Sequence, residues 1–329
     1  MTSVTIGEVK IVPMHMNAIF LDDFISIYTS LDEMKMKTII EEIQNEPTVL
    51  DFSRVETTIT TSTIEKLAKH INNKMVRLVN MNEHIYSQIT AAAEYKLISE
   101  SNQNGFYNAH TDSYPVDQYK EIDDLLEQDG YIQNEIVRSC KENVSEGIRK
   151  ISSNVFTSKY FEHSKLFLNT QIARMVVYLL AVKVQAVEKE GSKKNIKFIS
   201  SSINGGVIAT MLGILFGYEH IGIPHLGSSI DVEDNRYLNL INKNDRLIYV
   251  FDIIALGNEQ RMVYTIARLT NANIIASVGL SYYSKYIPIN GEADTTDCIV
   301  PFCEIVEDIH YTASKEDMDV LLSLRDINE

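Results

Sequence analysis

The chain has 329 residues, of which 45% are hydrophobic and 23% charged, and its formal net charge is −15. This length predicts two domains, and the composition is too apolar for a disordered chain. The strong negative charge argues against nucleic acid as a partner of the isolated chain, because nucleic-acid binders carry basic patches.

The cysteines and histidines indicate neither disulfides nor metal. Cys140, Cys298 and Cys303 have no C-x-x-C spacing, which is typical of a reducing cytoplasm. The histidines show no H-x-x-H spacing, so no metal site is expected. The start of the chain has no signal-peptide pattern, and apolar stretches such as Val176–Val187 look too short and interrupted to span a bilayer. We therefore expect a cytoplasmic protein without a membrane partner.

Residues 1–100 predict a small α/β domain, because apolar runs with strand character alternate with helical periodicity. The hydroxyl residues at the start of the first helix can cap it. In chain order we expect a strand over Val4–Val12, a strand over Thr48–Phe52, a helix over Thr60–Ile71, a strand over Met75–Asn80 and a helix over Glu83–Ser99.

Residues 101–150 are expected to separate this domain from the next. Residues 101–118 lose all periodicity and are rich in Asn, Ser, Asp, Gly and Pro, which predicts a linker. A helical spacer then carries a narrow apolar stripe that either packs within the chain or pairs with a partner helix. The stripe consists of Ile132, Ile136, Cys140, Val144 and Ile148.

Residues 151–329 predict a doubly wound parallel sheet, because strands are separated by helices of 10 to 15 residues, about the length of a crossover helix. The expected strands are Ile196–Ser200, His220–Ile223, Arg246–Asp252, Asn273–Leu280 and Ile299–Ile305. The expected helices are Asn169–Glu188, one that opens at Gly205–Gly206 and runs to Phe216, Asn258–Leu269 and Lys315–Leu324.

Two loops follow strands of this sheet at the carboxyl edge, where such sheets bind ligands. The first, Ser201–Gly206, contains two glycines that allow backbone N–H groups to approach an anion at a helix N-terminus. The same glycines are common in ordinary turns.

The second loop carries a family resemblance. The run Asn244–Glu259 (NDRLIYVFDIIALGNE) resembles the phosphoribosyl-diphosphate signature of type I phosphoribosyltransferases. In that family two acids hold the ribose hydroxyls, and a loop of hydroxyl residues and glycine holds the 5′-phosphate. Segments Phe156–Leu168, 196–223 and 298–322 are similar to the orotate branch in the same order. The resemblance implies a ligand site that consists of Ser202, Asn204, Gly205, Gly206, Asp252, Gly257 and Asn258.

The signature is degenerate at the residues that would do the chemistry. Asp252 remains, but Phe251 replaces the other acid, Ala255 and Leu256 replace the hydroxyl pair, and Glu259 replaces a small hydroxyl residue. A carboxylate about 4 Å from a phosphate charge repels it by about 4 kcal/mol at an effective dielectric constant of about 20. We therefore assign no catalytic residue and do not expect ordinary phosphoribosyl transfer.

Two further expectations follow from the signature. The segment that resembles the mobile hood of the orotate branch, Leu226–Leu240, offers Arg236 as its basic residue against three acids. Mg²⁺ is expected only if the phosphoribosyl site works. Asp252 has an equally simple structural interpretation, in which it caps the helix at Asn258 or binds loop amides.

The first domain carries a shorter resemblance. Leu50–Val55 (LDFSRV) followed by Ile59–Ile64 (ITTSTI) resembles the STAS-like modules of bacteria, related to anti-sigma-factor antagonists, although Arg54 stands in place of the usual glycine. The resemblance implies Thr61 and Ser62 as candidates for phosphorylation or a partner surface. The simpler interpretation is that these hydroxyls cap the helix.

Together these patterns predict a STAS-like α/β domain followed by a degenerate phosphoribosyltransferase-like domain. We expect a regulatory or effector subunit that binds a nucleotide-like ligand or a protein partner, including another copy of itself. The domain pairing is similar to those of bacterial anti-phage or conflict systems. The alternative is a divergent active phosphoribosyltransferase or nucleotide-processing enzyme.

Overall fold

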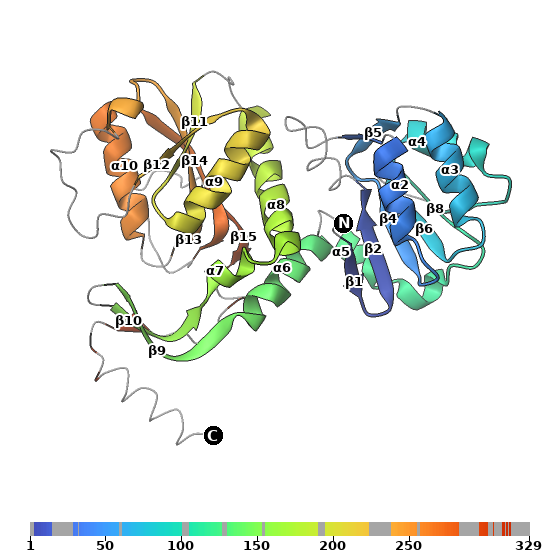
Figure 1. The fold of residues 1–329 in the computed structure, drawn as a ribbon, viewed down its shortest axis with the longest axis horizontal. Coiled ribbons are helices and arrows are strands. Elements are labelled where there is room, and N and C mark those ends of the chain that lie inside the picture. The colour runs from blue at the N-terminus through green and yellow to red at the C-terminus, as the bar shows by residue number, and fades with distance from the viewer. Residues whose placement is uncertain are drawn as a thin grey trace. The chain divides into compact units, whose positions relative to one another are not determined.

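The computed structural model describes residues 3–14, 29–31, 33–58, 61–100, 105–126, 130–152, 155–189, 195–223, 238–254, 257–282 and 296–301, together with residues 305, 311, 312, 314 and 316. The chain divides into two compact units (Figure 1), the first containing Met1–Ile132 and Ile214–Gly217 and the second Gln133–Gly213 and Tyr218–Glu329.

The first unit is built on a six-stranded mixed sheet with the order β1-β2-β4-β6-β8-β7. Its centre is parallel, from β2 through β4 to β6, and its outer strands run antiparallel to their neighbours. The strands are β1 (Val4–Ile6), β2 (Val9–Pro13), β4 (Thr48–Asp51), β6 (Val76–Met81), β7 (Ile98–Glu100) and β8 (Tyr107–His110), while β3 (Thr29–Leu31) and β5 (Val55–Thr58) form a separate parallel pair.

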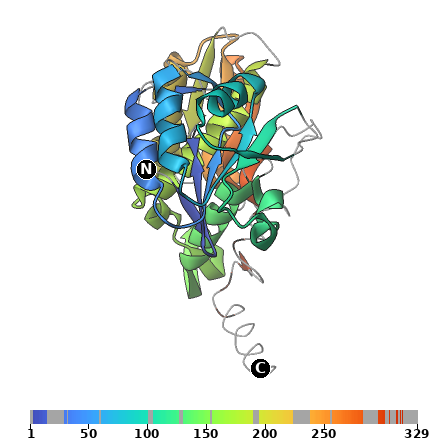
Figure 2. The same ribbon diagram turned by 90° about the vertical axis from the view of Figure 1, so that its right-hand side faces the viewer.

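Three helices pack on this sheet: α2 (Glu33–Glu42), α3 (Thr61–Ile71) and α4 (Glu83–Ala92). Residues at helical spacing, such as Ile64, Leu67 and Ile71 of α3, are fully buried in one core with the strands. Helices α2 and α3 lie side by side in both views (Figure 1, Figure 2).

Three expectations for this region were wrong. The single strand expected over Val4–Val12 is an antiparallel pair, β1 and β2. The helix expected to reach Ser99 ends at Ala92, because Ala93 takes an extended conformation and the chain then forms β7. Residues 107–110, expected in a linker, form β8 and pair with β6 and β7. The polar side chains that suggested a linker bind the sheet backbone instead; the Asn108 side chain, for example, accepts a hydrogen bond from Asn80 N at 2.8 Å.

The expected helical stripe is only half correct. After η1 (Val116–Tyr119) and α5 (Ile122–Leu126), helix α6 (Gly130–Glu142) buries Ile132, Ile136 and Cys140 completely. Val144 and Ile148 lie instead in β9 (Val144–Ser152). A spacing of four residues is compatible with one face of a helix and also with one face of a strand, so the pattern did not reveal the change.

Strand β9 forms an antiparallel hairpin with β10 (Val155–Phe161), and β10 also pairs with β16 (Tyr311–Thr312). A short helix, α7 (His163–Leu166), follows β10 directly. Most of β10 and all of α7 lie in the segment Phe156–Leu168 that resembles the orotate branch, whereas β9 precedes that segment. The last expected helix, Lys315–Leu324, lies outside the described residues apart from residue 316.

The second unit contains a five-stranded, entirely parallel sheet with the order β12-β11-β13-β14-β15, which confirms the predicted α/β fold class. The strands are β11 (Ile196–Ser200), β12 (Glu219–Gly222), β13 (Arg246–Ile254), β14 (Asn273–Tyr282) and β15 (Thr296–Pro301). The helices are α8 (Thr170–Lys189), α9 (Ile203–Phe216) and α10 (Asn258–Thr270), with a short 3-10 turn, η3 (Leu238–Leu240).

The strand order places helices on both faces of the sheet. The connection from β11 through α9 leads outward to β12, and that from β13 through α10 leads the opposite way to β14. Because both crossovers are right-handed by default, their helices cover opposite faces. Helix α8 packs on β14 and β15.

Helix α8 corrects the expectation that the apolar stretches are too short and interrupted to span a bilayer. It is long and apolar enough to cross a membrane, because an 18-residue window, Thr170–Val187, has a mean hydropathy of 1.3. Over half of that window, 56%, is buried inside the protein. A core helix of a soluble protein passes the same test of length and composition.

One face of β13 forms the centre of a core with α10. Tyr249 and Phe251 are both buried there, with ring centroids 5.7 Å apart. The Phe251 ring lies against Gly279 on the neighbouring strand, so closely that a Cβ at position 279 would overlap both the ring and the Phe251 carbonyl oxygen. Phe251 therefore requires glycine beside it.

We expect Gly279→Ala to destabilise the second unit by about 1–3 kcal/mol, because the added methyl overpacks a filled core. Gly222→Ala is the matched control, since the nearest atom to its Cβ is His220 Cε1 at 3.9 Å. Urea denaturation followed by circular dichroism measures both. Equal midpoints for the two variants would contradict the contact between Phe251 and Gly279.

Candidate functional site

The strand order fixes where a ligand site can form. Between β11 and β13 the direction of the connections reverses, and ligands of doubly wound sheets bind in the crevice at such a switch point. The two expected loops, Ser201–Gly206 and the one before Asn258, follow these two strands. Ala255 and Leu256, in the second loop, lie outside the described residues, as does most of the expected hood.

Asp252 joins the two loops. It lies near the end of β13 and is 5% exposed. Ser202 Oγ donates a hydrogen bond to Asp252 Oδ1 at 2.8 Å, and Asn204 Nδ2 donates to Oδ2 at 3.4 Å. The structure therefore brings together three of the predicted residues at one carboxylate.

The same carboxylate also binds a cation from the chain itself. His163 Nε2, on α7, lies 2.9 Å from Asp252 Oδ2, and His163 Nδ1 lies 3.3 Å from the carbonyl oxygen of Phe161. A carbonyl and an ionised carboxylate can only accept hydrogen bonds, so both ring nitrogens must carry protons. With both protons in place, below its raised pKa, His163 is an imidazolium that neutralises Asp252.

The pKa values of the two groups agree with this pairing. Burial lowers the pKa of His163, but the hydrogen bond and charge of Asp252 outweigh burial, and the net pKa is raised. Burial raises the pKa of Asp252, but the hydrogen bond and charge of His163, with the bonds from Ser202 and the Ile253 backbone, leave it lowered. Each group stabilises the charged form of the other.

Glu259 adds a second negative charge. Its Oε2 accepts a hydrogen bond from Ser201 Oγ at 3.2 Å. Since the Ser201 hydroxyl proton is used there, the Tyr249 hydroxyl, 3.1 Å away, must be the donor to Ser201 Oγ. Together His163, Asp252 and Glu259 carry one net negative charge, which disfavours an anionic ligand.

The predicted glycines are explained by packing and backbone conformation. A Cβ on Gly205 would lie 2.7 Å from Ser202 Oγ and 3.0 Å from Val250 O, so glycine lets α9 approach β13. Gly206 has more room, with Ser200 Oγ 3.5 Å from its Cβ position. Gly257 has a φ of +71°, a left-handed conformation that favours glycine, and precedes Asn258, the first residue of α10.

His220 forms a second polar group at the other side of α9. Thr210 Oγ1 donates to Gly206 O at 2.8 Å, so it must accept the hydrogen bond from His220 Nδ1 at 3.1 Å. His220 Nε2 is then the acceptor for Ser200 Oγ at 2.8 Å. Burial lowers the pKa of His220, which keeps the ring neutral. Because Ser200 is 1% exposed, we interpret this group as a structural tie between α9 and β12.

In the first unit, the predicted residues Thr61 and Ser62 begin α3, and Ser62 is exposed. Strand β5 separates them from Asp51, at the end of β4. Asp51 is fully buried and accepts hydrogen bonds from the Ser53 backbone and hydroxyl, from Asn80 and, at 2.8 Å, from the Tyr131 hydroxyl. Asp51 therefore links the end of β4 to the residues that follow it, to β6 and to α6.

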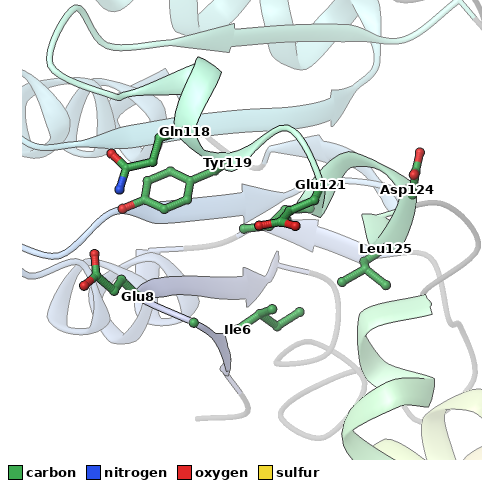
Figure 3. Close-up of a pocket in the computed structure, with 9 residues that line it drawn as sticks. Ile6, Glu8, Gln118, Tyr119, Glu121, Asp124 and Leu125 are labelled. Carbon is green, nitrogen blue, oxygen red and sulfur yellow. The ribbon is translucent and has the colours of Figure 1, made fainter.

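A cavity of about 730 Å³ lies elsewhere in the first unit (Figure 3). The turn between β1 and β2 and the segment of η1 and α5 line it, and three acids, Glu8, Glu121 and Asp124, face it together with Tyr119. It contains none of the predicted site residues.

The sequence pointed to Asp252, Ser202 and Asn204 but missed His163. Its spacing from the other histidines gave no signal, and it is far from Asp252 along the chain.

The structure also does not favour Mg²⁺ here, because His163, Ser202 and Asn204 occupy both oxygens of Asp252. Among the described residues, no group of three His, Cys, Asp or Glu side chains is arranged to hold a metal ion.

No model of a known protein family matches the sequence. No curated protein matches it either. Solved structures that are similar include adenine phosphoribosyltransferase from Trypanosoma brucei, with 10% identity over 54% of this chain and 81% of that chain and a TM-score of 0.42.

Others are orotate phosphoribosyltransferase from Mycobacterium tuberculosis (11% identity, 53% of this chain, 98% of that chain, TM-score 0.40) and adenine phosphoribosyltransferase from Saccharomyces cerevisiae (13%, 51%, 99%, 0.38). These similarities are too distant to carry an argument about ligand or reaction. The fold assignment rests on the order and register of the parallel sheet.

The ion pair predicts how stability depends on pH. Because the pKa of His163 is raised in the folded state, its contribution to stability is complete below the ordinary pKa of 6.5. This contribution is lost as the pH rises through the pKa of the folded state. Because the pKa of Asp252 is lowered, its contribution is lost only as the pH falls below the ordinary 3.8. We expect the difference in melting temperature between the wild type and His163→Gln to become smaller as the pH rises above about 6.5.

At pH 6, His163→Gln alone should cost about 3 kcal/mol, because it leaves a buried carboxylate without its cation. The double variant His163→Gln/Asp252→Asn serves as the control and should be more stable than the sum of the two single changes predicts, by at least about 1 kcal/mol. Thermal melts of the wild type, the two single variants and the double variant measure the coupling between His163 and Asp252. Additive effects would contradict the ion pair.

Proposed function

We propose that this protein is a cytoplasmic regulatory or effector subunit. Its second unit would be a degenerate phosphoribosyltransferase-like domain that binds a nucleotide-like ligand or a protein partner without transferring a phosphoribosyl group. Its first unit would be a STAS-like interaction module. An anti-phage or conflict operon is the genetic context we propose, and the neighbouring genes test it.

One observation carries the proposal: the Asp252 carboxylate is already saturated by its own chain. The resemblance assigns to this residue the binding of ribose hydroxyls. Here His163 and Ser202 bind the carboxylate at 2.9 and 2.8 Å. A substrate would have to displace these partners, and leaving a buried charged group without them costs about 1–3 kcal/mol for each lost bond, or more.

The local charge supports the same proposal. Glu259 stands where the resemblance expects a hydroxyl residue to meet the 5′-phosphate, and it is held by Ser201. A phosphate would therefore meet two carboxylates and one imidazolium. An uncharged nucleoside fits this charge balance better than a nucleotide or a diphosphate does.

The melting temperature of the full chain with magnesium and phosphoribosyl diphosphate tests the loss of transferase function. A ligand at 100 times its dissociation constant stabilises a protein by about 2.7 kcal/mol, which is several degrees of melting shift. We expect no shift. A clear shift would favour the alternative, an active phosphoribosyltransferase or nucleotide-processing enzyme.

A second melt tests the ligand class. We expect nucleosides to raise the melting temperature more than their 5′-monophosphates do, because the phosphate is repelled. Glu259→Gln keeps the size of the side chain and removes its charge. It should therefore reduce the difference between the melting shifts that nucleosides and their monophosphates cause. If the monophosphate binds better than the nucleoside to the wild type, the proposed charge effect is wrong.

A further inference from the structure

The Asp252 carboxylate is closed to a ligand in the arrangement that the structure shows. The residue is 5% exposed, and side chains of its own unit bind both of its oxygens. A ligand at the switch point of the sheet reaches this carboxylate only after one of those side chains has moved. A working site therefore needs a partner of Asp252 that can leave.

Two of the three side-chain partners do not meet this need. Ser202 Oγ donates to Asp252 at 2.8 Å and also accepts a hydrogen bond from Gly205 N at 3.0 Å, so its rotation would disturb the start of α9 as well. Asn204 Nδ2 makes a long bond of 3.4 Å that involves no cation. Moving either side chain would leave the contact with His163 in place.

His163 combines the charged contact with the easiest route away. Its side chain is 22% exposed and that of Asp252 is 7% exposed, so the ring is closer to solvent than the carboxylate that it covers. The ring belongs to α7, a helix of four residues whose Leu166 is buried. Leu166 can keep this helix on the core while the ring of His163 turns into water. Such a movement needs only a change of side-chain rotamer.

The number of protons on the ring determines how firmly it is held. The bonds to Asp252 Oδ2 and to the carbonyl oxygen of Phe161 each need an N–H group of the ring. A neutral imidazole has one N–H group, so it keeps only one of these two bonds. Loss of the proton from His163 therefore weakens its hold on the carboxylate.

The surroundings of the ring set the pH range of this change. Among the described residues, the charged and titratable groups beside it are Asp252 of β13, Glu259 of α10 and Tyr160 of β10, whose ring centroid is 6.5 Å away. On α7 itself, Lys165 pairs with the residue that precedes the helix. Because the two carboxylates outweigh burial and raise the pKa of His163 above the ordinary 6.5, the ring loses its proton only above that pH.

We propose that His163 is a pH-sensitive plug on the candidate site: the protonated ring occupies Asp252, and a ligand reaches this carboxylate when the ring turns away. The inference rests on the proposed function, because it requires a ligand that binds at Asp252. Since the imidazolium donates a hydrogen bond, the group that replaces it must also be a donor, such as a hydroxyl or amino group. Binding becomes tighter as the pH rises above about 6.5, because the ion pair that opposes it is lost.

Equilibrium dialysis of the full chain against adenosine tests the plug. We expect the dissociation constant of the wild type to be several-fold lower at about pH 8 than at about pH 6. His163→Ala should lower the dissociation constant at about pH 6 by at least about tenfold, because no charge-assisted bond has to be broken. The variant should also lose the pH dependence. In nuclear magnetic resonance spectra of the wild type, adenosine should lower the pKa of His163 toward 6.5.

Lys165→Ala is the matched control. It removes a positive charge from the same helix and leaves the contact with Asp252, so its affinity for adenosine should depend on pH as that of the wild type does. Circular dichroism shows whether each variant is folded. The pH series and the spectra of the wild type decide the outcome if His163→Ala does not fold.

The failure of the plug and the failure of the proposed function give different results. Wild-type binding that does not depend on pH, or a folded His163→Ala that binds adenosine no more tightly, would overturn the plug and leave the proposed function standing. If neither the wild type nor folded His163→Ala binds adenosine at either pH, the proposed binding of a nucleoside is wrong, and the plug is wrong with it.

Discussion

A carboxylate inside a protein must be satisfied there by a cation or by hydrogen bonds, and in the second unit this constraint applies to Asp252. Its partners come from three separate parts of the chain: His163 from α7, Ser202 and Asn204 from the start of α9, and the Ile253 backbone from its own strand. The carboxylate thus joins the hairpin region to the carboxyl edge of the sheet. The same bonds occupy the position at which the family resemblance expects ribose.

The first unit solves a similar problem without a cation. Asp51 also lies at the carboxyl end of a central parallel strand, but neutral donors from Ser53, Asn80 and Tyr131 satisfy it. Strand ends in parallel sheets gather polar groups, because the loops that follow them converge. In both units the acid found there holds chain segments together, so an acid at such an edge is not by itself a sign of catalysis.

The sequence predicted the elements that have a strong periodic or apolar signal. Strand β11 matches its expected bounds, and α10 differs by one residue, because turn residues flank both. The errors have physical causes: β8 is polar since its side chains bind backbone, and β9 shares the spacing of a helical stripe. The role of His163 could not be predicted, because it depends on a contact between segments that only the fold brings together.

Phe251 stands where the sequence resemblance expects an acid, and it has a packing role of its own. Side chains alternate along a strand, and Phe251 lies with Tyr249 in the core under α10, whereas Asp252 meets Ser202 at the start of α9. Phe251 also depends on Gly279 beside it. An acid restored at position 251 would enter an apolar core and would leave Gly279 without the ring that fills its space. Phe251 is therefore part of the packing of this unit, and an acid placed at position 251 would destabilise the core before it added a ligand contact.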